Sequence, residues 1–276
     1  MSQSNTSNKA QPNRITVHEH FGCKYAPFSD TFTLRETWAS KADTENLRRM
    51  ETLLEQGKSF SLVGDPGTGK SMLIKALLEK LDTKVYRHVL IPWAGQRTPQ
   101  ILREICDKIG LDTVGRTPLL QRLHKAFSRQ GDGPYTVLVI DEAHSLPREA
   151  LQELFSLTSD HSTRTAGASI ILCGHPMLTR ILDLDINSAI RTRIAMRFVM
   201  ATLNESEVED FVKFRLKVAK ADPGLFLAEA MQTLHVDSKG NRRIIMNLAG
   251  NAMSLAVERS EKVVSDELVR EVGNMA

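Results

Sequence analysis

The chain has 276 residues, of which 41% are hydrophobic and 25% charged, and its net charge is +3 with a pI near 8.7. This composition is ordinary for a globular protein with a sizeable core, and it excludes a fibrous or largely disordered chain. No apolar stretch approaches the roughly 20 residues of a membrane-spanning helix, so we expect no membrane partner. Three cysteines lie far apart without metal-ligand spacing, which favours reduced thiols in a cytoplasmic protein. The mildly basic balance permits a nucleic-acid partner without requiring one.

Two stretches precede the first predicted strand. Residues 1–13 are polar and lack the apolar segment of a signal peptide, and a disordered N-terminal tail is predicted over 1–17. Residues 18–45 are expected to form a docked lead-in segment, with Phe21 and Phe28 packed on the core. A helix is predicted over 44–55, where apolar residues recur on one face.

A glycine-rich stretch then lies between an apolar run at 60–63, read as a strand, and an amphipathic run at 72–78, read as a helix. This is the context of a phosphate-binding loop, whose backbone N–H groups surround an anion at the N-terminus of the new helix. Lys70 is expected to reach the β- and γ-phosphates, and the Ser71 hydroxyl to bind a magnesium ion (Mg²⁺). The alternative is a plain turn, but the spacing of the residue types favours the loop. The predicted nucleotide-binding residues are Gly64, Asp65, Pro66, Gly67, Thr68, Gly69, Lys70 and Ser71.

Strands and helices alternate through the following residues. A strand is predicted at 84–91 and helices at 99–109 and 118–127, which indicates a parallel sheet with crossover connections. Residues 137–140 predict a strand that is buried on both faces and ends at Asp141 and Glu142. Because ligands of such sheets bind at the carboxyl ends of the strands, Asp141 is expected to hold Mg²⁺ and Glu142 to polarise the attacking water.

Another buried strand is predicted over 168–174, and His175 follows its end. This histidine is expected to contact the γ-phosphate or the attacking water, or else to be a satisfied loop residue. Residues 186–197 are read as a helix that runs into a last strand at 198–203 and carries Arg191, Arg193 and Arg197; a solvated basic face is the alternative. From residue 204 onward helical patterns dominate, over 205–220, 225–234, 243–257 and 266–272.

From about residue 18 onward the order of these features resembles that of AAA+ ATPases, and more narrowly that of their ExeA-like branch. The branch typically has a phenylalanine-glycine segment that ends in proline-phenylalanine, a glycine-glutamine-proline after the fourth strand, two arginines one residue apart, and a glycine-any-proline-arginine motif. The matching stretches are Phe21-Gly22 to Pro27-Phe28, Gly174-His175-Pro176, Arg191-Thr192-Arg193 and Gly240-Asn241-Arg242-Arg243. Two positions depart from the pattern, since His175 replaces a glutamine and Arg242 replaces a proline.

The resemblance implies an α/β fold: a P-loop NTPase sheet flanked by helices over 46–203, followed by a small all-α lid domain over 204–276. It implies a magnesium-dependent ATPase that forms an ATP-dependent homo-oligomer, as a ring or a filament. Arg193, with Arg191 as second candidate, would be the arginine finger offered to the nucleotide of a neighbouring subunit. Arg243 would contact the nucleotide from the lid of its own subunit, and His175 would act as the first sensor.

The resemblance also suggests partners. Secretion members of the branch usually carry a membrane helix and a peptidoglycan-binding domain, neither of which we expect from the pattern of this sequence. Chains of this length resemble the transposition ATPases of the TnsC, TniB and MuB group, which assemble on duplex DNA with ATP and recruit or activate a transposase. We expect that role, with an ATPase of a secretion or other protein-partner system as the alternative. The expected DNA contacts are Arg97, in a first polar loop over 93–99, and Arg116 and Thr117 in a second loop. Ordinary solvated residues at loop tips are equally compatible with the sequence.

Overall fold

A computed structural model of the chain describes residues 16–29, 38–92, 95–127, 134–158 and 167–275. The predicted tail therefore lies outside the described residues, except for its last two positions, and so do Trp93 and Ala94 of the first predicted DNA loop. The chain divides into two compact units, one of Met1–Phe32 with Leu203–Ala276 and the other of Thr33–Thr202.

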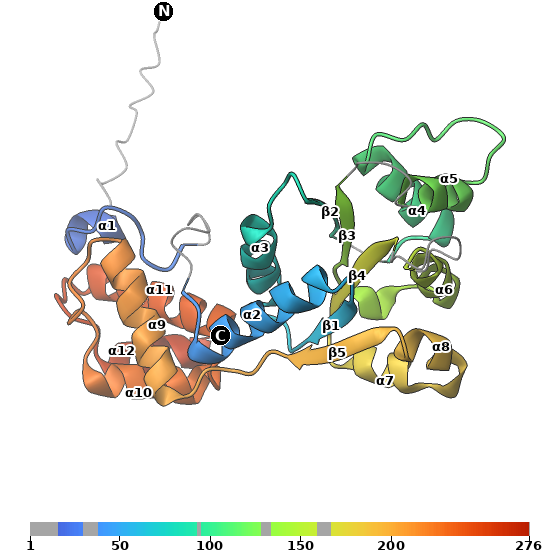
Figure 1. Ribbon diagram of the computed structural model, residues 1–276. Coiled ribbons are helices and arrows are strands. Elements are labelled where there is room, and N and C mark those ends of the chain that lie inside the picture. The colour runs from blue at the N-terminus through green and yellow to red at the C-terminus, as the bar shows by residue number, and fades with distance from the viewer. Residues whose placement is uncertain (1–15, 30–37, 93–94, 128–133, 159–166, 276) are drawn as a thin grey trace, which may run out of the picture. The chain divides into compact units, whose positions relative to one another are not determined.

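The larger unit contains a five-stranded sheet in the order β2-β3-β4-β1-β5 (Figure 1). Every neighbouring pair is parallel, which confirms the predicted α/β architecture. All residues of β1, β3 and β4 are buried, and this burial explains why β3 and β4 are almost continuously apolar. The strands are Ser59–Val63 (β1), Tyr86–Ile91 (β2), Tyr135–Ile140 (β3), Ala168–Gly174 (β4) and Ile194–Val199 (β5).

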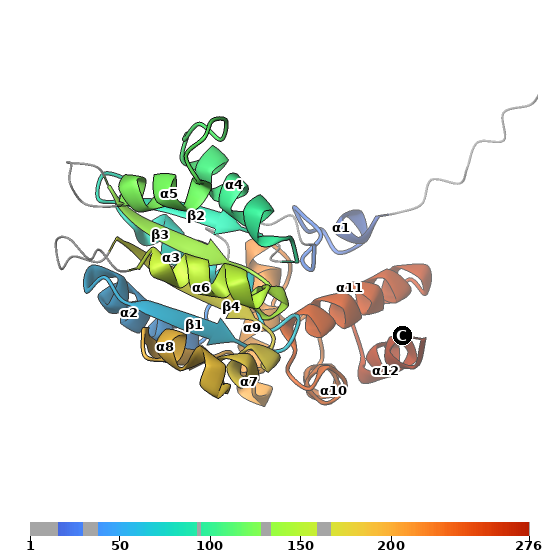
Figure 2. The ribbon, with the colours of Figure 1, turned by 90° about the vertical axis from the view of Figure 1, so that its right-hand side faces the viewer.

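Helices cover both faces of this sheet and create two cores. On one face, α2 and α3 pack their apolar residues against β1 and β3, as Leu47 and Leu77 do against Phe60 and Val139. On the other face, helices from α4 to α8 contribute residues such as Ile101 to a second core (Figures 1 and 2). These helices are Lys41–Glu55 (α2), Lys70–Lys80 (α3), Thr98–Lys108 (α4), Leu119–Phe127 (α5), Arg148–Ser156 (α6), Met177–Asp183 (α7) and Ser188–Arg191 (α8).

The boundary predicted before the last strand is wrong. The helix α8 ends at Arg191, and Arg197 lies in the strand β5 instead of in a helix. Ile194 and Phe198 are buried four residues apart, a spacing that suits a helix and a strand equally. Pairing with β1 decides in favour of the strand, in which Arg197 forms a 2.7 Å ion pair with Asp183.

The smaller unit is helical, and residues 18–29 of the predicted lead-in segment pack within it, whereas the end of that segment begins α2 in the larger unit. The buried guanidinium of Arg215 donates hydrogen bonds to the carbonyl oxygens of Pro27, at 2.8 Å, and Ser29. Phe28 meets Phe226 edge to face, with ring centroids 5.7 Å apart. The helices are Val17–His20 (α1), Glu205–Val218 (α9), Ala228–Ser238 (α10), Arg242–Glu258 (α11) and Asp266–Met275 (α12). Within the described ranges, no helix has both the length and the apolar composition needed to cross a bilayer.

Candidate nucleotide site

The backbone of the predicted phosphate loop needs glycine at three positions. Gly67 and Gly69 have φ angles of 83° and 101°, in the left-handed region that L side chains rarely adopt. Gly64 packs closely instead, because a Cβ there would lie 2.8 Å from the Cβ of Met200 and 2.9 Å from the Thr68 hydroxyl. The loop connects the end of β1 to the start of α3, where backbone N–H groups are available to an anion.

Lys70 places a largely buried ammonium group beside this loop. Its Nζ donates hydrogen bonds to the carbonyl oxygens of Gly64, at 2.7 Å, and Asp65, at 3.0 Å. Burial lowers the pKa of Lys70, and the carboxylates of Glu142 and Asp141 oppose that shift. The site therefore combines one poorly solvated cation with two nearby anions.

Ser71 and Asp141 come together from α3 and the end of β3. The Ser71 hydroxyl donates to Oδ2 of Asp141 at 3.2 Å, which brings two oxygen ligands within reach of one cation. Among the described residues no group of three or more histidine, cysteine, aspartate or glutamate side chains could hold a metal. A hydroxyl and one carboxylate fit Mg²⁺, which is commonly bound by few protein oxygens together with water and substrate phosphates.

Glu142 adopts an uncommon backbone conformation at the end of β3. Its φ angle is 51°, in the left-handed region, and its N–H donates to Oδ1 of Asp141 at 2.9 Å. The carboxylate is half exposed, as a group that acts on water must be. The two acidic residues predicted from the sequence therefore lie at the phosphate-loop edge of the sheet, beside β1 and β4.

His175 lies at the end of β4 and faces the phosphate loop. Its Nδ1 accepts a hydrogen bond from the N–H of Met177 at 3.2 Å, so the neutral ring carries its hydrogen on Nε2. That Nε2 lies 3.7 Å from Oδ1 of Asp65 in the loop. The structure thus places a histidine donor beside the residues predicted to bind phosphate.

His144, which the sequence pattern did not single out, belongs to the same cluster. Its ring centroid lies 5.9 Å from that of His175, and its Nδ1 lies 3.6 Å from Oε2 of Glu142. The available signal was a polar residue two positions after Glu142, immediately beyond a buried strand. Its partners at the end of β4, Gly174 and His175, are at least 30 positions away in the chain, so the sequence could not pair them.

Cys173 lies behind the cluster, in β4. It is buried, and burial together with the charge of Asp141 raises the pKa of its thiol above the ordinary range. A thiol of this kind is unreactive at neutral pH.

The two candidate finger arginines lie just before β5, at the end of the sheet where the parallel strands begin, and not at the end where the phosphate loop follows β1. Arg193 donates from Nη1 to the carbonyl of Phe155 at 2.9 Å, and Arg191 donates to that of Asp183 at 3.2 Å. Ile194 pairs with Ser59, the first residue of β1, whereas the phosphate loop follows the last residue of that strand. A strand rises about 3.3 Å per residue, so the length of β1 separates these arginines from the loop of their own chain by about 15 Å.

Arg243 lies in the first turn of α11, within the helical unit. Its side chain is exposed and its N–H is capped by Oδ1 of Asn241 at 3.1 Å, whereas the preceding Arg242 is buried. Of the two neighbouring arginines, Arg243 is therefore the one whose guanidinium is accessible to a ligand.

The residues predicted to contact DNA are exposed. Arg97 precedes α4, while Arg116 and Thr117 lie in the connection between α4 and α5. The carbonyl of Thr117 accepts a 3.0 Å hydrogen bond from Arg122, which ties this connection to α5. A residue must be exposed to contact DNA, but ordinary surface arginines are exposed as well, so exposure alone does not test this prediction.

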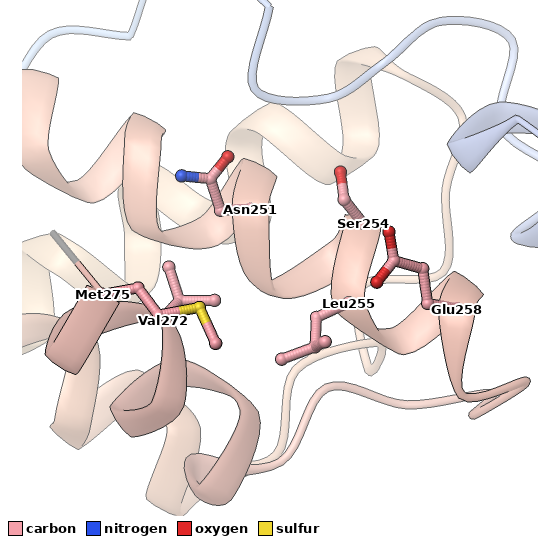
Figure 3. A pocket seen from close by; sticks show the side chains of 6 residues that line it. All are labelled: Asn251, Ser254, Leu255, Glu258, Val272 and Met275. Carbon is pink, nitrogen blue, oxygen red and sulfur yellow. The ribbon is translucent and has the colours of Figure 1, made fainter.

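A separate pocket of about 260 Å³ lies between α11 and α12 (Figure 3). Its lining contains none of the residues predicted to bind the nucleotide. The lining residues are Asn251, Ser254, Leu255, Glu258, Val272 and Met275.

Comparison with known proteins agrees with this geometry. Residues 53–182, which include β1, the phosphate loop and β3 with its acidic end, match the family model described as an AAA domain. The chain has the AAA+ P-loop ATPase fold. The predicted resemblance to AAA+ ATPases is therefore confirmed at the level of the fold and the ATPase core.

A curated relative belongs to a secretion system. The chain is 29% identical over 257 residues to the general secretion pathway protein A of Aeromonas hydrophila, across 91% of this chain and 47% of the relative. The chain thus spans about half the length of the curated relative that it matches. This relative agrees with the predicted ExeA-like branch, while the transposition group stays a prediction.

Solved structures share the fold at low sequence identity. Cdc6p from Pyrobaculum aerophilum has a TM-score of 0.71 at 18% identity, with 91% of this chain and 70% of that chain covered. The Aeropyrum pernix ORC1 protein in complex with DNA has a TM-score of 0.69 at 17% identity, covering 92% and 69%. The Thermotoga maritima RuvB Holliday junction branch migration motor has a TM-score of 0.57 at 16% identity, covering 86% and 69%.

Proposed function

We propose that the chain hydrolyses ATP at the edge of the sheet formed by the phosphate loop and the ends of β3 and β4. The observation that carries this proposal is the meeting of Ser71 and Asp141 at 3.2 Å, with Lys70 and Glu142 beside them. Lys70 binds the β- and γ-phosphates in place of the loop carbonyls that it now contacts. Ser71 and Asp141 are the residues that would hold Mg²⁺, which when bound would neutralise charge on the phosphate oxygens.

Glu142 serves as the group that orients and polarises the attacking water. The half-exposed carboxylate lies one residue beyond Asp141, at the phosphate-loop edge of the sheet. His175 donates from Nε2 toward the γ-phosphate or the water, a role supported by the orientation of its ring toward Asp65. Arg243 contacts the nucleotide from the helical unit of the same subunit.

We further propose that hydrolysis requires a neighbouring subunit. Arg193, or Arg191 in its place, stabilises the transition-state charge in the partner's site, since β1 separates both from the phosphate loop of their own chain. Such an arrangement makes assembly into a ring or a filament a condition of turnover.

The decisive test of the ATPase site is Glu142→Gln. Amide substitution keeps the shape of the side chain but removes the charge that polarises water, so turnover should fall about 10²–10⁴-fold while ATP affinity is retained. Steady-state phosphate release and equilibrium ATP binding measure the two quantities. Glu149→Gln, an exposed carboxylate on α6, is the matched control and should turn over like the parent. Normal turnover by Glu142→Gln would refute the assignment.

For the cellular role we propose ATP-dependent assembly on duplex DNA that recruits or activates a transposase. Exposed Arg97 and Arg116, with Thr117 beside Arg116, would contact phosphates without reading bases. The net charge of +3 is compatible with such a partner.

A second candidate role is supported by the curated relative. The 29% identity to general secretion pathway protein A favours an ATPase whose partner is a protein of a secretion system, without DNA binding. Electron microscopy with and without ATP and duplex DNA separates the two roles. Assemblies that form on DNA only with ATP support the first, and ATP-dependent assemblies that ignore DNA support the second.

A further inference from the structure

His144 lies between two groups that compete for one ring nitrogen. Its Nδ1 is 3.4 Å from the N–H of His175, a donor, and 3.6 Å from Oε2 of Glu142, an acceptor. Both distances exceed the 2.7–3.2 Å that is typical of N–H···O hydrogen bonds, so neither contact is at its best length.

A neutral imidazole satisfies only one of these groups at a time. With hydrogen on Nε2, the lone pair of Nδ1 accepts from His175, and the ring makes no hydrogen bond to Glu142. With hydrogen on Nδ1, the ring donates to the carboxylate of Glu142 and the N–H of His175 loses its acceptor. The position of the end of β4 therefore influences whether Nδ1 of His144 accepts from His175 or donates to Glu142.

The packing around β4 keeps the ring in this place. A Cβ at Gly174 would lie 3.2 Å from Nδ1 of His144 and 3.3 Å from its backbone nitrogen. The 3₁₀ turn Ala143–Ser145 (η2), which carries His144, thus rests directly on the end of β4. The side chain of His144 is 22% exposed, against 51% for Glu142, so the histidine is the better-held member of the pair.

We infer that His144 is a positioning residue that couples the end of β4 to Glu142. When Nδ1 donates to the Glu142 carboxylate, His144 holds that carboxylate in one place beside the attacking water; when the N–H of His175 engages Nδ1 instead, the carboxylate loses this hydrogen bond. Movement of His175 at the nucleotide thereby controls whether the water-polarising group is held in position. This inference rests on the proposed ATPase site.

The test compares His144→Leu with His144→Asn. Leucine removes both contacts, so kcat should fall about 10- to 100-fold, as expected for a misplaced catalytic group, while the KM for ATP is unchanged. Asparagine offers an acceptor and a donor at nearly the same position as Nδ1, and should restore kcat to within a few-fold of the parent. His88→Leu, at an exposed position on β2, is the matched histidine control and should match the parent.

A double substitution distinguishes positioning from a general structural effect. Because His144 acts through Glu142, adding His144→Leu to Glu142→Gln should cause no further loss of turnover. A full additional loss, or a His144→Leu protein within twofold of the parent, would overturn the inference. Equal losses in the leucine and asparagine variants would also overturn it. Normal turnover by Glu142→Gln alone would instead refute the proposed function, so the two failures are distinguishable.

Discussion

Lys70 is the residue on which the nucleotide site depends most directly. It lies 8% exposed at the start of α3, with its ammonium group bound to two carbonyls of the loop and near the carboxylates of Asp141 and Glu142. Burial disfavours its charged form, while the surrounding oxygens favour it. Phosphate oxygens of a bound nucleotide would add anionic partners and so strengthen the charged state.

Lys70→Ala should therefore weaken ATP binding strongly. A hydrogen bond to a charged group contributes about 1.5–3 kcal/mol, which corresponds to a loss of about 10- to 100-fold in affinity or more when both phosphates are contacted. Equilibrium binding of a fluorescent ATP analogue measures the change, and Lys75→Ala, exposed on the same helix, is the control. A folded Lys70→Ala protein with undiminished affinity would contradict the assignment.

At the scale of elements, the lead-in segment is tied to α9 by a buried arginine. Arg215 donates to the carbonyls of Pro27 and Ser29, which lie more than 180 positions earlier in the chain. The contact of Phe28 with Phe226 adds apolar packing to the same attachment. A segment without regular structure after residue 20 is thereby fixed to the helical unit.

Replacing Arg215 should loosen this attachment. Arg215→Leu leaves one buried and one partly buried carbonyl without their charged donor, so we expect a destabilisation of about 2–4 kcal/mol in denaturant unfolding. Amide hydrogen exchange should rise in residues 18–29. Lys213→Leu, which removes an exposed ion pair with Glu209 on the same helix, should cost less than about 1 kcal/mol. Equal stability losses for the two variants would argue against the attachment.

At the scale of the whole molecule, the separation of Arg193 from the phosphate loop predicts complementation between subunits. Arg193→Ala should bind ATP like the parent and hydrolyse it poorly, because its own pocket is intact but it offers no finger. When it is mixed with Glu142→Gln, which keeps the arginine, turnover should rise with the fraction of interfaces at which an Arg193→Ala site faces a Glu142→Gln subunit. Phosphate release across a mixing series measures this rescue. A simple sum of the two separate activities would mean that the finger does not act in trans.

DNA binding, where it occurs, should depend on assembly. Because each neutralised phosphate releases about 0.9 counterion, affinity for duplex DNA should fall steeply with salt, show little sequence dependence and require ATP. Arg97→Ala with Arg116→Ala should abolish it, since repetition in an assembly multiplies each weak contact. Arg48→Ala with Arg49→Ala, exposed on α2, removes the same charge and should leave binding intact. Binding that ignores nucleotide, or survives the first pair, would exclude these loops.

The sequence alone determined those parts of the protein that depend on neighbouring residues. Neighbouring residue types leave few possible backbone conformations in such segments. This is why the sequence was enough to predict the phosphate loop with its glycines and Lys70, the acidic end of β3, and the buried strands β3 and β4. Helical periodicity likewise located α9 to α12 of the smaller unit, apart from their exact ends, but not the short helix α1.

Tertiary structure alone decided what depends on residues far apart in the chain. Pairing with β1 made a strand of Ile194–Val199, whose spacing was equally helical, and moved Arg193 to the edge of the sheet opposite the phosphate loop. Packing against Gly174 and His175 turned His144 into a neighbour of Glu142. In each case the deciding partner comes from another strand of the sheet, and no pattern within the segment itself specifies which strand that is.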